Sequence, residues 1–547
     1  MVYEPLDTYN FHEQEWDDYE ELCNSFAWEI PDEFNTASYI CDRWADESPE
    51  AVAIATNDPD KPEYTYARLH HTANRLANYF TERGIGKGDA IAINAPQKPE
   101  AVAAMIATWK LGGVVVPLSV LFGEEGLAYR LRDSEARGFI VDEEAIETYE
   151  SIASDVDLDA VVSVDSPGAT GADSFQEAIS DQSPAFETVS TQAEDTGVIM
   201  YTSGTTGDPK GVVHAHRYVL SNLSGYQFHV ANAHLSEDDL FWSPVEWSWG
   251  ATLYVIVLPT LFYGQSILGY ARQGFDPEDA LRLIDNFDIT LFFAPATVLR
   301  MILQLDDTSY DVSSVRVLSS GGESLDRDVR DRVRKIFGDV AIHEAYGQTE
   351  ALTTILSCER YFPSKPGMIG RSAPGQDVHV LDPDTQEPVE PGEIGEFAIR
   401  YEDNPVCFKE YLNKPDTTAQ KVVDGWLLLE DLGWMDEEGY FGYHSRKDDV
   451  IISSGYRISP AEIEESLAEH ESVANVAVIG VPDDMRGEVP KAFVQLTPAY
   501  EPSDELAETL QSFVKEDLAK YEYPRRIAFR DSLPTTTTGK IQRHELE

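Results

Sequence analysis

The feature that most limits the possible folds is an alternation of short apolar runs and helical patterns, which begins near residue 50. At four junctions an apolar run is followed by small or polar residues and then by a helical segment. These runs occupy residues 198–201, 291–293, 315–318 and 340–342. Such alternation is typical of α/β architecture, in which loops at the carboxyl ends of strands form the ligand crevice. The four loops either converge on one site or are simple connections.

The last hundred residues have a different pattern. Ser459, Pro460 and Glu462 predict a capping box with proline at the first helical position. Two strand-like runs follow, "VANVAVIGV" and "KAFVQLT", and then "SDELAETLQSFVKEDL" with apolar residues spaced for one helix face. A chain of 547 residues is too long for one core. We therefore predict a large α/β domain over residues 1–445 and a small α+β domain over residues 446–547.

The charge balance excludes some partners. The chain has 98 Asp and Glu against 41 Lys and Arg, a formal net charge of −57. Such a chain repels nucleic acids and anionic membranes. The acidic residues are spread along the whole length, which suggests a solvated surface adapted to a very salty cytoplasm, as in a halophilic archaeon.

Cysteine use and hydropathy agree with a cytoplasmic protein. The four cysteines (Cys23, Cys41, Cys358 and Cys407) have no CxxC spacing, which disfavours a disulfide framework or a cysteine zinc site. The acidic start of the chain does not resemble a signal peptide. The longest apolar stretch, residues 254–270, is broken by Pro259 and Gly264, so we expect buried core rather than a membrane span.

The segment "YTSGTTGDPKG", residues 201–211, is the first candidate ligand loop. It is not a Walker A motif, because Asp208 and Pro209 separate Gly207 from Lys210. Glycines let backbone N–H groups approach an anion, and the hydroxyls and Lys210 add donors and positive charge. A phosphate-binding loop and a flexible surface turn are both compatible with this composition.

Further segments carry a family resemblance. They are "GGES" (321–324), "EAYGQTE" (344–350), "WLLLEDLGWMDEEGYF", "SRKDDVIISSGYRISPAEIE" and "LPTTTTGKIQR". With the first loop, and in this order, they resemble the motifs of the adenylate-forming superfamily of acyl-CoA synthetases, luciferases and peptide-synthetase adenylation domains. The resemblance covers residue 40 to the end. Two departures are mild: Ser445 replaces a usual glycine, and Glu430 replaces a usual small residue.

The resemblance implies a large N-terminal domain with several sheets, a mobile C-terminal domain, and an AMP-forming ligase that uses ATP and Mg²⁺. It activates a carboxylic acid to acyl-AMP, releases pyrophosphate, and passes the acyl group to a thiol. The implied ATP-binding residues are Thr202, Ser203, Gly204, Thr205, Thr206, Gly207, Lys210, Gly322, Glu323, Glu344, Ala345, Tyr346, Gly347, Gln348, Thr349, Asp431, Arg446 and Lys540.

Individual roles follow from the same resemblance. Lys540 bridges the carboxylate and the α-phosphate, and Lys210 lies near the departing pyrophosphate. Thr349 bonds the α-phosphate, and Glu350 is the magnesium ligand. Asp431 accepts the ribose hydroxyls.

Two further positions have more than one interpretation. Asp448 resembles the hinge on which the small domain turns, although a capping or salt-bridging aspartate would look the same. His214 and His216 have HxH spacing, but without a third ligand we expect them to pack or to line a pocket rather than bind zinc.

The C-terminal region resembles medium-chain acyl-CoA synthetases, which act in fatty acid metabolism. The implied CoA-binding residues are Ser454, Gly455, Tyr456, Arg486, Lys515, Tyr523, Pro524 and Arg525. Arg457 is expected to face the substrate. CoA is a polyanion, so an acidic protein must gather local cations to bind it.

The acyl substrate is the least determined feature. Acetate-specific relatives carry tryptophan before "QTE", where this chain has Gly347, so we expect a longer pocket. Trp247, Trp249, Gly250 and Leu253 are the expected wall, although core tryptophans would look the same. We favour a medium-chain or branched aliphatic acid.

Several alternatives stay open. They are acetate or propionate, butyrate, an aryl acid, transfer to a carrier-protein thiol, and an inactive binding protein that keeps the fold. The sequence does not determine the oligomeric state.

Overall fold

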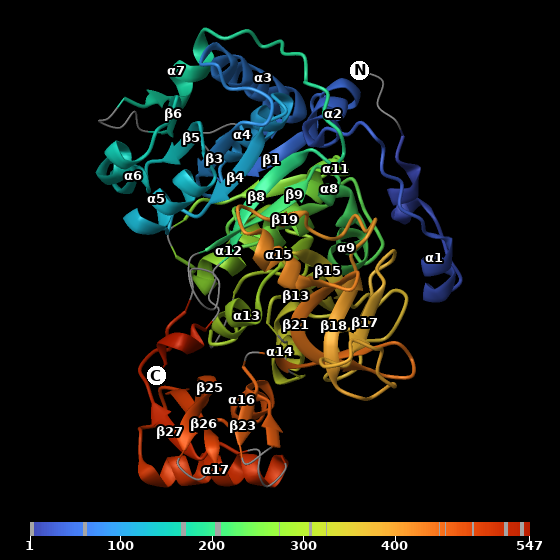
Figure 1. Cartoon of the computed structure of the whole chain (residues 1–547), viewed down its shortest axis with the longest axis vertical. Coiled ribbons are helices and arrows are strands. Elements are labelled where there is room, and N and C mark those ends of the chain that lie inside the picture. Colours follow the sequence, from blue (N-terminus) through green and yellow to red (C-terminus); the bar gives the residue numbers. More distant parts are fainter. Residues whose placement is uncertain are drawn as a thin grey trace.

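The computed structural model describes most of the chain in two parts, a large body and a smaller C-terminal unit at one end (Figure 1). The described residues are 5–57, 63–165, 171–202, 209–272, 274–305, 309–323, 325, 327–447, 449–453, 456–483, 486–518, 523–535 and 541–546. The α/β class expected from the sequence is confirmed.

One sheet of the large body has eight described strands in the order β19-β9-β8-β4-β3-β5-β6-β7. Its strands are β3 (Ala90–Asn94), β4 (Val114–Leu118), β5 (Gly138–Asp142), β6 (Ala160–Val164), β7 (Asp173–Ser174), β8 (Thr196–Thr202), β9 (Lys210–Ala215) and β19 (Glu410–Tyr411). The central strands β3 to β6 are parallel and fully buried. Helices cover both of its faces: α3 (Tyr66–Glu82), α4 (Pro99–Lys110), α5 (Glu124–Asp133), α6 (Ile146–Ile152) and α7 (Phe175–Ser180).

The second sheet has nine described strands in the order β16-β15-β14-β13-β12-β10-β11-β1-β2. They are β1 (Val52–Thr56), β2 (Tyr64–Thr65), β10 (Leu240–Trp242), β11 (Ser266–Gly269), β12 (Leu291–Phe293), β13 (Val317–Gly321), β14 (Ala341–Gln348), β15 (Ala351–Leu356) and β16 (Arg371–Ser372). One face carries α12 (Pro277–Phe287), α13 (Ala296–Ile302) and α14 (Arg327–Phe337).

The opposite face of this sheet is covered by a broken helical layer. Its elements are α8 (Tyr218–Ser221), α9 (Leu223–Gly225), the π-helix η5 (Tyr226–Val230), α10 (Gly250–Thr252), the π-helix η6 (Leu253–Val257) and α11 (Leu258–Phe262). The apolar stretch at residues 254–270 lies in this layer and in β11, and most of it is buried, as expected.

Two of the four junctions predicted from the sequence are confirmed, and two are wrong. Strands β12 and β13 lead into helices α13 and α14. In contrast, β8 is followed by the antiparallel strand β9, and "HEAYGQTE" continues strand β14 before the antiparallel β15. Apolar patterning alone did not separate a second strand from a helix at these places.

A third sheet completes the large body. It consists of β17 (Val378–Leu381), β18 (Gly395–Arg400), β20 (Val422–Val423), β21 (Trp426–Met435) and β22 (Phe441–Arg446), and α15 (Pro415–Lys421) precedes β20. Strand β21 pairs with β22 so that Asp431 lies opposite Arg446.

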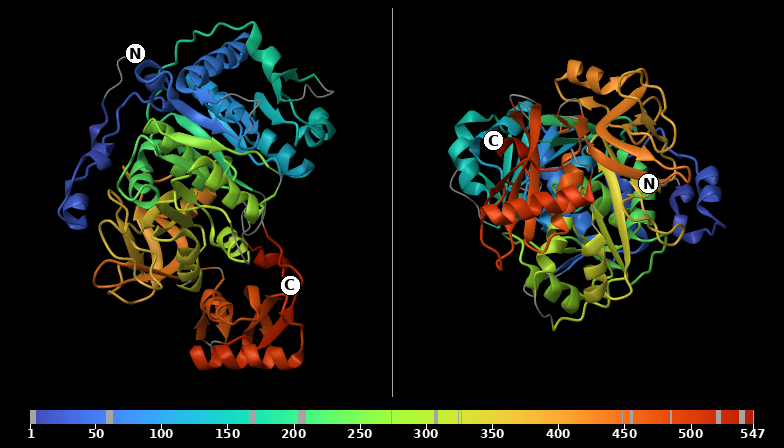
Figure 2. Two further views of the ribbon diagram at one scale, coloured as in Figure 1. Left: turned by 180° about the vertical axis from the view of Figure 1, so that it is seen from behind. Right: turned by 90° about the horizontal axis from the view of Figure 1, so that it is seen from below.

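The N-terminal segment runs along the outside of the large body (Figure 2). Helix α1 (Tyr19–Ser25) is tied to β16, because the Tyr19 hydroxyl donates to the carbonyl of Ser372. The Trp28 indole donates to the Gly375 carbonyl at 3.0 Å. The π-helix η3 (Ser38–Asp42) and α2 (Arg43–Glu47) then lead into the first strand.

The C-terminal unit has the predicted α+β content. Strands β23 (Ile451–Ser453), β24 (Tyr456–Ile458), β25 (Val473–Asp483), β26 (Gly487–Leu496) and β27 (Arg526–Phe529) form its sheet, with helices α16 (Pro460–Ala468) and α17 (Asp504–Asp517). Pro460 opens α16, but the predicted capping box is wrong. The Ser459 hydroxyl donates to the His444 carbonyl at 2.6 Å, and Glu462 pairs with the His444 ring at 3.1 Å. A tertiary contact to β22 replaces the local cap.

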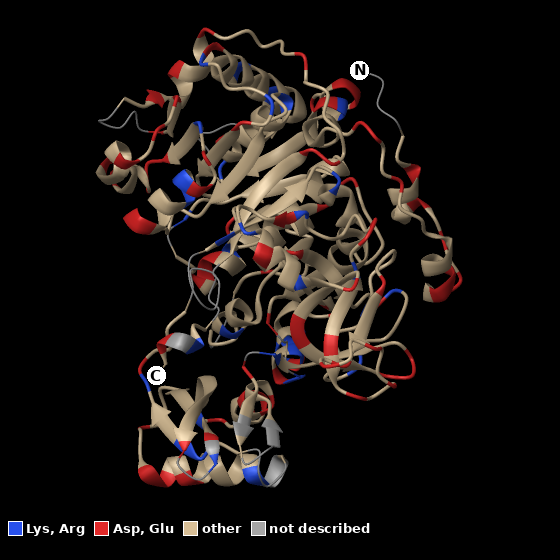
Figure 3. Cartoon of the chain, viewed as in Figure 1, with Lys and Arg blue, Asp and Glu red and all other residues tan. Residues whose placement is uncertain are grey.

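Acidic residues are distributed over all parts of the large body and the C-terminal unit (Figure 3). Among the described helices, none is both long enough and apolar enough to cross a membrane.

Candidate active site

The hairpin of β14 and β15 carries the "EAYGQTE" segment. Gln348 pairs with Ala351, so Thr349 and Glu350 form the tight turn between the strands. A Cβ added at Gly347 would lie 2.4 Å from the backbone nitrogen of Thr353 and 2.9 Å from the carbonyl carbon of Leu352. Glycine is therefore required here by backbone packing. This direction points into the hairpin, so it adds no support to the expectation that Gly347 lengthens the acyl pocket, which stays a prediction.

Asp431 lies beside this hairpin and is almost fully buried. Its Oδ2 accepts hydrogen bonds from the Tyr346 hydroxyl and from Gln348 Nε2, both at 2.6 Å. Its Oδ1 accepts one longer bond, 3.4 Å, from the Tyr443 hydroxyl. Burial and the carboxylate of Asp431 raise the pKa of Tyr346 well above its ordinary value, which keeps Tyr346 protonated as a donor.

Arg446 faces Asp431 across the β21–β22 pair. Burial acts to lower the pKa of this guanidinium, but Asp431, Tyr443, Asp449 and Glu430 outweigh it and raise the pKa. The residue is charged at any physiological pH. Asp431 and Arg446 thus place an acceptor and a cation side by side.

The Glu350 carboxylate is buried on the other side of the hairpin turn. It accepts a short hydrogen bond from the Tyr411 hydroxyl, and its backbone carbonyl accepts one from the Phe408 N–H at 2.8 Å. The ammonium of Lys210 lies 5.2 Å from the centre of the Tyr411 ring. Tyr411 therefore links the predicted magnesium ligand to the predicted pyrophosphate lysine. Sequence reasoning missed Tyr411, because a tyrosine in "FKEYLNK" matches no motif.

The two ends of the phosphate loop lie together. Thr202 and Lys210 are register partners at the ends of β8 and β9. The predicted residues Ser203, Gly204, Thr205, Thr206 and Gly207 fall outside the described residues. Their role stays a prediction.

The predicted ATP-binding residues in and near β13 and β14 are held by protein contacts. Gly322 has φ +84°, which favours glycine. The Glu323 carboxylate accepts from the Thr297 hydroxyl at 2.8 Å and so ties the loop to α13. The Glu344 carboxylate accepts from the Leu325 N–H at 2.7 Å and pairs with Arg330 of α14. Both carboxylates have structural partners. Ala345 lies between Glu344 and Tyr346 in β14.

The predicted acyl wall reaches the same hairpin. A Cβ at Gly250 would lie 3.8 Å from the Thr349 hydroxyl and 2.9 Å from the Met200 sulfur, so this glycine lies against the β14–β15 turn. Trp249 is half-buried and precedes α10, whereas Trp247 is fully buried and packs against Gly269. Leu253 is buried at the start of η6.

Two buried polar residues that the sequence did not reveal are His229 of η5 and Ser319 of β13. The ring of His229 is fully buried and lies 6.4 Å from the rings of Phe293 and His343. Ser319 lies between those two residues in the β-sheet register. Neither His229 ring nitrogen nor the Ser319 hydroxyl has a well-formed hydrogen bond within the described residues. Burial and His343 hold the pKa of His229 well below its ordinary value, so the ring is neutral.

The histidines with HxH spacing pack into the core. His214 stacks on Tyr218 with ring centres 4.0 Å apart, and its Nε2 bonds the Thr349 carbonyl at 2.8 Å. Burial lowers its pKa to about 3. His216 bonds Thr36 through Nδ1 at 2.9 Å. His214 thus supports the β14–β15 turn through the Thr349 carbonyl.

Two of the cations predicted to bind CoA contact the same tyrosine. The ammonium of Lys515 lies 4.0 Å from the Tyr523 ring centre, and the Arg525 guanidinium donates to the Tyr523 hydroxyl at 2.8 Å. Pro524, between Tyr523 and Arg525 in the sequence, is buried, and Arg486 is exposed near the end of β25. Of Tyr456 and Arg457 only the backbone, in β24, is described. Lys540, Asp448, Ser454 and Gly455 lie outside the described residues.

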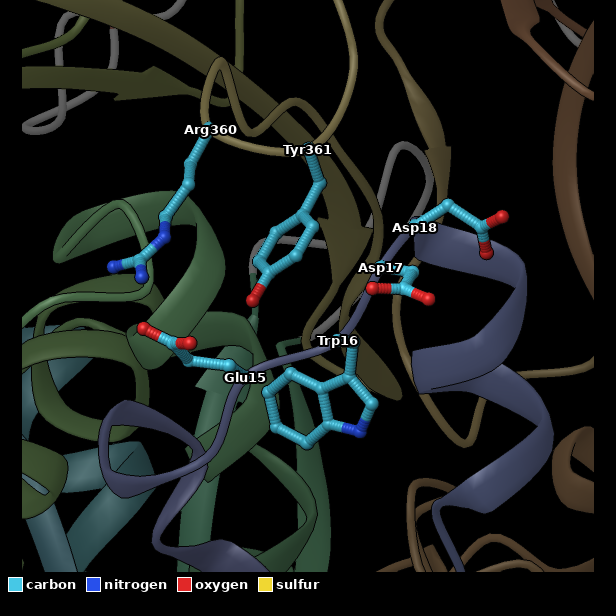
Figure 4. A pocket seen from close by; sticks show the side chains of 6 residues that line it. All are labelled: Glu15, Trp16, Asp17, Asp18, Arg360 and Tyr361. Atoms are coloured by element: carbon cyan, nitrogen blue, oxygen red, sulfur yellow. The ribbon is translucent and has the colours of Figure 1, made fainter.

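The pocket in Figure 4 lies elsewhere and has a volume of about 240 Å³. Its walls are Glu15, Trp16, Asp17 and Asp18 of the N-terminal segment with Arg360 and Tyr361. It contains none of the predicted site residues.

The buried carboxylates of Glu350 and Asp431, the cations Lys210 and Arg446 and the apolar residues near Gly250 surround one hairpin, as expected for an adenylating ligase. The comparisons agree: the family model of the AMP-binding enzymes matches residues 41–412 and the model of their C-terminal domain matches residues 462–540, so the chain belongs to the AMP-binding enzyme family. It is an AMP-forming acid–thiol ligase that uses ATP, Mg²⁺ and CoA.

Individual relatives are similar over nearly their whole length. The uncharacterized acyl-CoA ligase YtcI of Bacillus subtilis (strain 168) is 34% identical over 485 residues, 88% of this chain and 90% of the relative. The mitochondrial acyl-coenzyme A synthetase ACSM3 of Mus musculus is 31% identical over 549 residues, 97% and 93% of the two chains. The solved anthranilate CoA ligase AuaEII in complex with anthranoyl-AMP aligns with a TM-score of 0.87 and 29% identity, covering 94% and 97%.

Proposed function

We propose that the enzyme activates a medium-chain or branched aliphatic acid to acyl-AMP and transfers the acyl group to CoA. The observation that carries this proposal is the position of the β14–β15 turn. Thr349 lies against Gly250 of the acyl wall, while Gln348 and Tyr346 of the same hairpin hold Asp431. An acid on one side and the nucleotide on the other would therefore meet at this turn. The long alignment with ACSM3 supports an acyl-CoA product.

Each of the predicted ATP-binding residues has a separate role in the first step, the formation of acyl-AMP. The acid's carboxylate oxygen attacks the α-phosphorus, and negative charge moves to pyrophosphate. Asp431 and Arg446 orient the nucleotide, and Thr349 lies at the α-phosphate. Lys210 stabilises charge on the departing group. Lys540 would bridge the two reacting groups. Catalysis is then mainly positioning and charge stabilisation.

Glu350 fits a magnesium role. It is a buried, hard oxygen donor, and Mg²⁺ is commonly bound by one or two carboxylates together with substrate phosphates. When bound, the ion neutralises phosphate charge. Tyr411 fixes the rotamer of this carboxylate through its hydrogen bond.

The second step, acyl transfer to CoA, needs cations because CoA is a polyanion. We propose that Lys515, Arg525 and Arg486 meet its phosphates, with residues 454–457 along the pantetheine path. We also propose that residues 446–547 move as a unit about Asp448. The Lys515–Tyr523–Arg525 cluster supports this assignment, since it gathers two cations on one aromatic ring. A carrier-protein thiol is the competing acceptor.

One observation favours a second class of acid. The buried pair of neutral His229 and Ser319 could hydrogen-bond a neutral polar substituent on the acyl chain or ring. The similarity to an anthranilate CoA ligase fits such a substrate. A second carboxylate is disfavoured, because no basic residue occurs between residues 245 and 255.

The test is an acid panel in molar salt. Pyrophosphate exchange and thioester formation with CoA are measured from acetate to dodecanoate, with branched, hydroxylated and aromatic acids. We expect the highest kcat/KM for acids of medium length. Exchange without acyl-CoA would disprove CoA as the acceptor, and activity with acetate alone would disprove the longer pocket. A preference for substituted acids that is lost in Ser319→Ala would establish the second class.

A further inference from the structure

Lys421 is a buried cation next to the nucleotide-binding residues, and no motif assigns it a role. It is the last residue of α15 and is 5% exposed. Its ammonium lies 2.9 Å from Glu430 Oε2 and 3.5 Å from Gln348 Oε1. Lysine is rarely buried this deeply unless it is paired.

The partner of Lys421 is held in a strained conformation. Glu430 has φ +57°, in the left-handed region that non-glycine residues rarely adopt. Its backbone N–H donates to Glu396, and its carbonyl accepts from the Lys447 N–H at 2.8 Å. Burial opposes its charge, but Lys421, Arg446 and Lys210 outweigh burial and lower its pKa. Strained residues of this kind concentrate at functional sites.

The decisive contact is the one between Lys421 and the amide of Gln348. An amide has one acceptor end and one donor end, whereas a carboxylate only accepts and an ammonium only donates. Gln348 Nε2 donates to Asp431 Oδ2 at 2.6 Å and to the Leu429 carbonyl, and its Oε1 faces Lys421 at 3.5 Å. A flipped amide would place oxygen against carboxylate and NH₂ against ammonium. Lys421 at the acceptor end, together with Asp431 and the Leu429 carbonyl at the donor end, therefore fixes which end of Gln348 faces Asp431.

The orientation of Gln348 determines how Asp431 is presented. Gln348 and Tyr346 both donate to Oδ2, which anchors that oxygen. Oδ1 receives only the longer bond from Tyr443 among the described contacts. The anchored carboxylate thus directs Oδ1 to the place where nucleotide hydroxyls would bind.

We propose that Lys421 is a positioning residue for nucleotide recognition: paired with Glu430, it orients Gln348 and thereby holds Asp431 for the ribose hydroxyls. This inference rests on the proposed role of Asp431. A purely structural ion pair between α15 and β21 would stabilise the fold equally well, but it would have no influence on which sugar is bound.

The test is direct binding of ATP, 2′-deoxy-ATP and 3′-deoxy-ATP to the full chain by calorimetry, which needs no knowledge of the acid. Lys421→Met removes the ammonium and leaves Glu430 near solvent, since that side chain is 44% exposed. We expect ATP to bind about tenfold more weakly and the preference for ATP over both deoxynucleotides to fall by a similar factor. Lys421→Arg should recover part of the preference. Lys414→Met, at the start of the same helix, is the matched control and should change neither quantity.

The possible outcomes distinguish the role of Asp431 in binding the ribose from the role of Lys421 in positioning Gln348. If the wild-type enzyme binds ATP and the deoxynucleotides equally, the role of Asp431 is wrong, and this proposal loses its basis. If the wild type discriminates and Lys421→Met discriminates equally well, Lys421 is only structural and the proposal is wrong. Should Lys421→Met fail to fold, Lys421→Met/Glu430→Gln removes both charges and must show the same loss of preference.

Discussion

Replacing Gly347 by alanine would test how tightly the active-site hairpin is built. The added Cβ would lie 2.4 Å from the Thr353 nitrogen, whereas ordinary contacts begin at 3.4 Å. The strands must therefore separate by the difference, 1.0 Å, in a place where every neighbour is backbone. Overpacking of this kind costs about 1–3 kcal/mol. Because Thr349 is two residues further on, a displacement near 1 Å should lower the adenylation rate about 100-fold.

The assay is pyrophosphate exchange together with thermal unfolding of the same preparations. Gly86→Ala is the control, because a Cβ there meets nothing within 4 Å and its φ is not positive. We expect the control to match the wild type and Gly347→Ala to lose both stability and rate. A Gly347→Ala enzyme with unchanged Tm and exchange rate would refute the packing argument. A Gly347→Trp enzyme that stays fully active with acetate alone would instead support the pocket-length interpretation.

Further predictions concern the C-terminal lysine, pH and salt. Lys540→Ala should abolish adenylation but spare thioester formation from supplied acyl-AMP; equal loss of both steps would contradict its role. Burial lowers the pKa of His214 to about 3 and of His216 and His343 to about 4, from an ordinary value of 6.5. The unfolded state therefore takes up protons first as pH falls, so the stability present above pH 6.5 should decline toward pH 4. The Tm of His216→Gln should fall less steeply over this pH range than the Tm of the wild type. With a net charge of −57, Tm should rise between about 0.1 M and about 2 M KCl, and an unchanged Tm would contradict the salt hypothesis.

Local patterns were sufficient to predict much of the architecture. Strands β25 and β26 and helix α17 lie where the apolar patterns predicted them, and Pro460 opens α16 as expected. Patterns failed where tertiary contacts decide. The Ser459 hydroxyl donates to the His444 carbonyl rather than capping its own helix. The segment after β8, which was expected to be a helix, forms strand β9 because it pairs antiparallel with β8.

The candidate site shows the same difference between what local motifs predict and what tertiary contacts decide. Motif spacing selected Asp431, Thr349 and Glu350, and the fold brings their elements together around one hairpin. It could not select Tyr411 or Lys421, whose importance comes from contacts with residues far along the chain. A lysine at the end of an exposed-looking helix gives no local signal that its ammonium is buried.

The central claim is that the carboxylate attacks the α-phosphorus of ATP and forms acyl-AMP. Incubation with an acid labelled with oxygen-18 in its carboxylate, followed by mass spectrometry of the nucleotide product, tests it directly. The mechanism predicts AMP that carries one labelled oxygen from the acid, because the bridging oxygen stays on phosphorus when CoA takes the acyl group. Unlabelled AMP, or formation of ADP and phosphate in its place, would contradict this account.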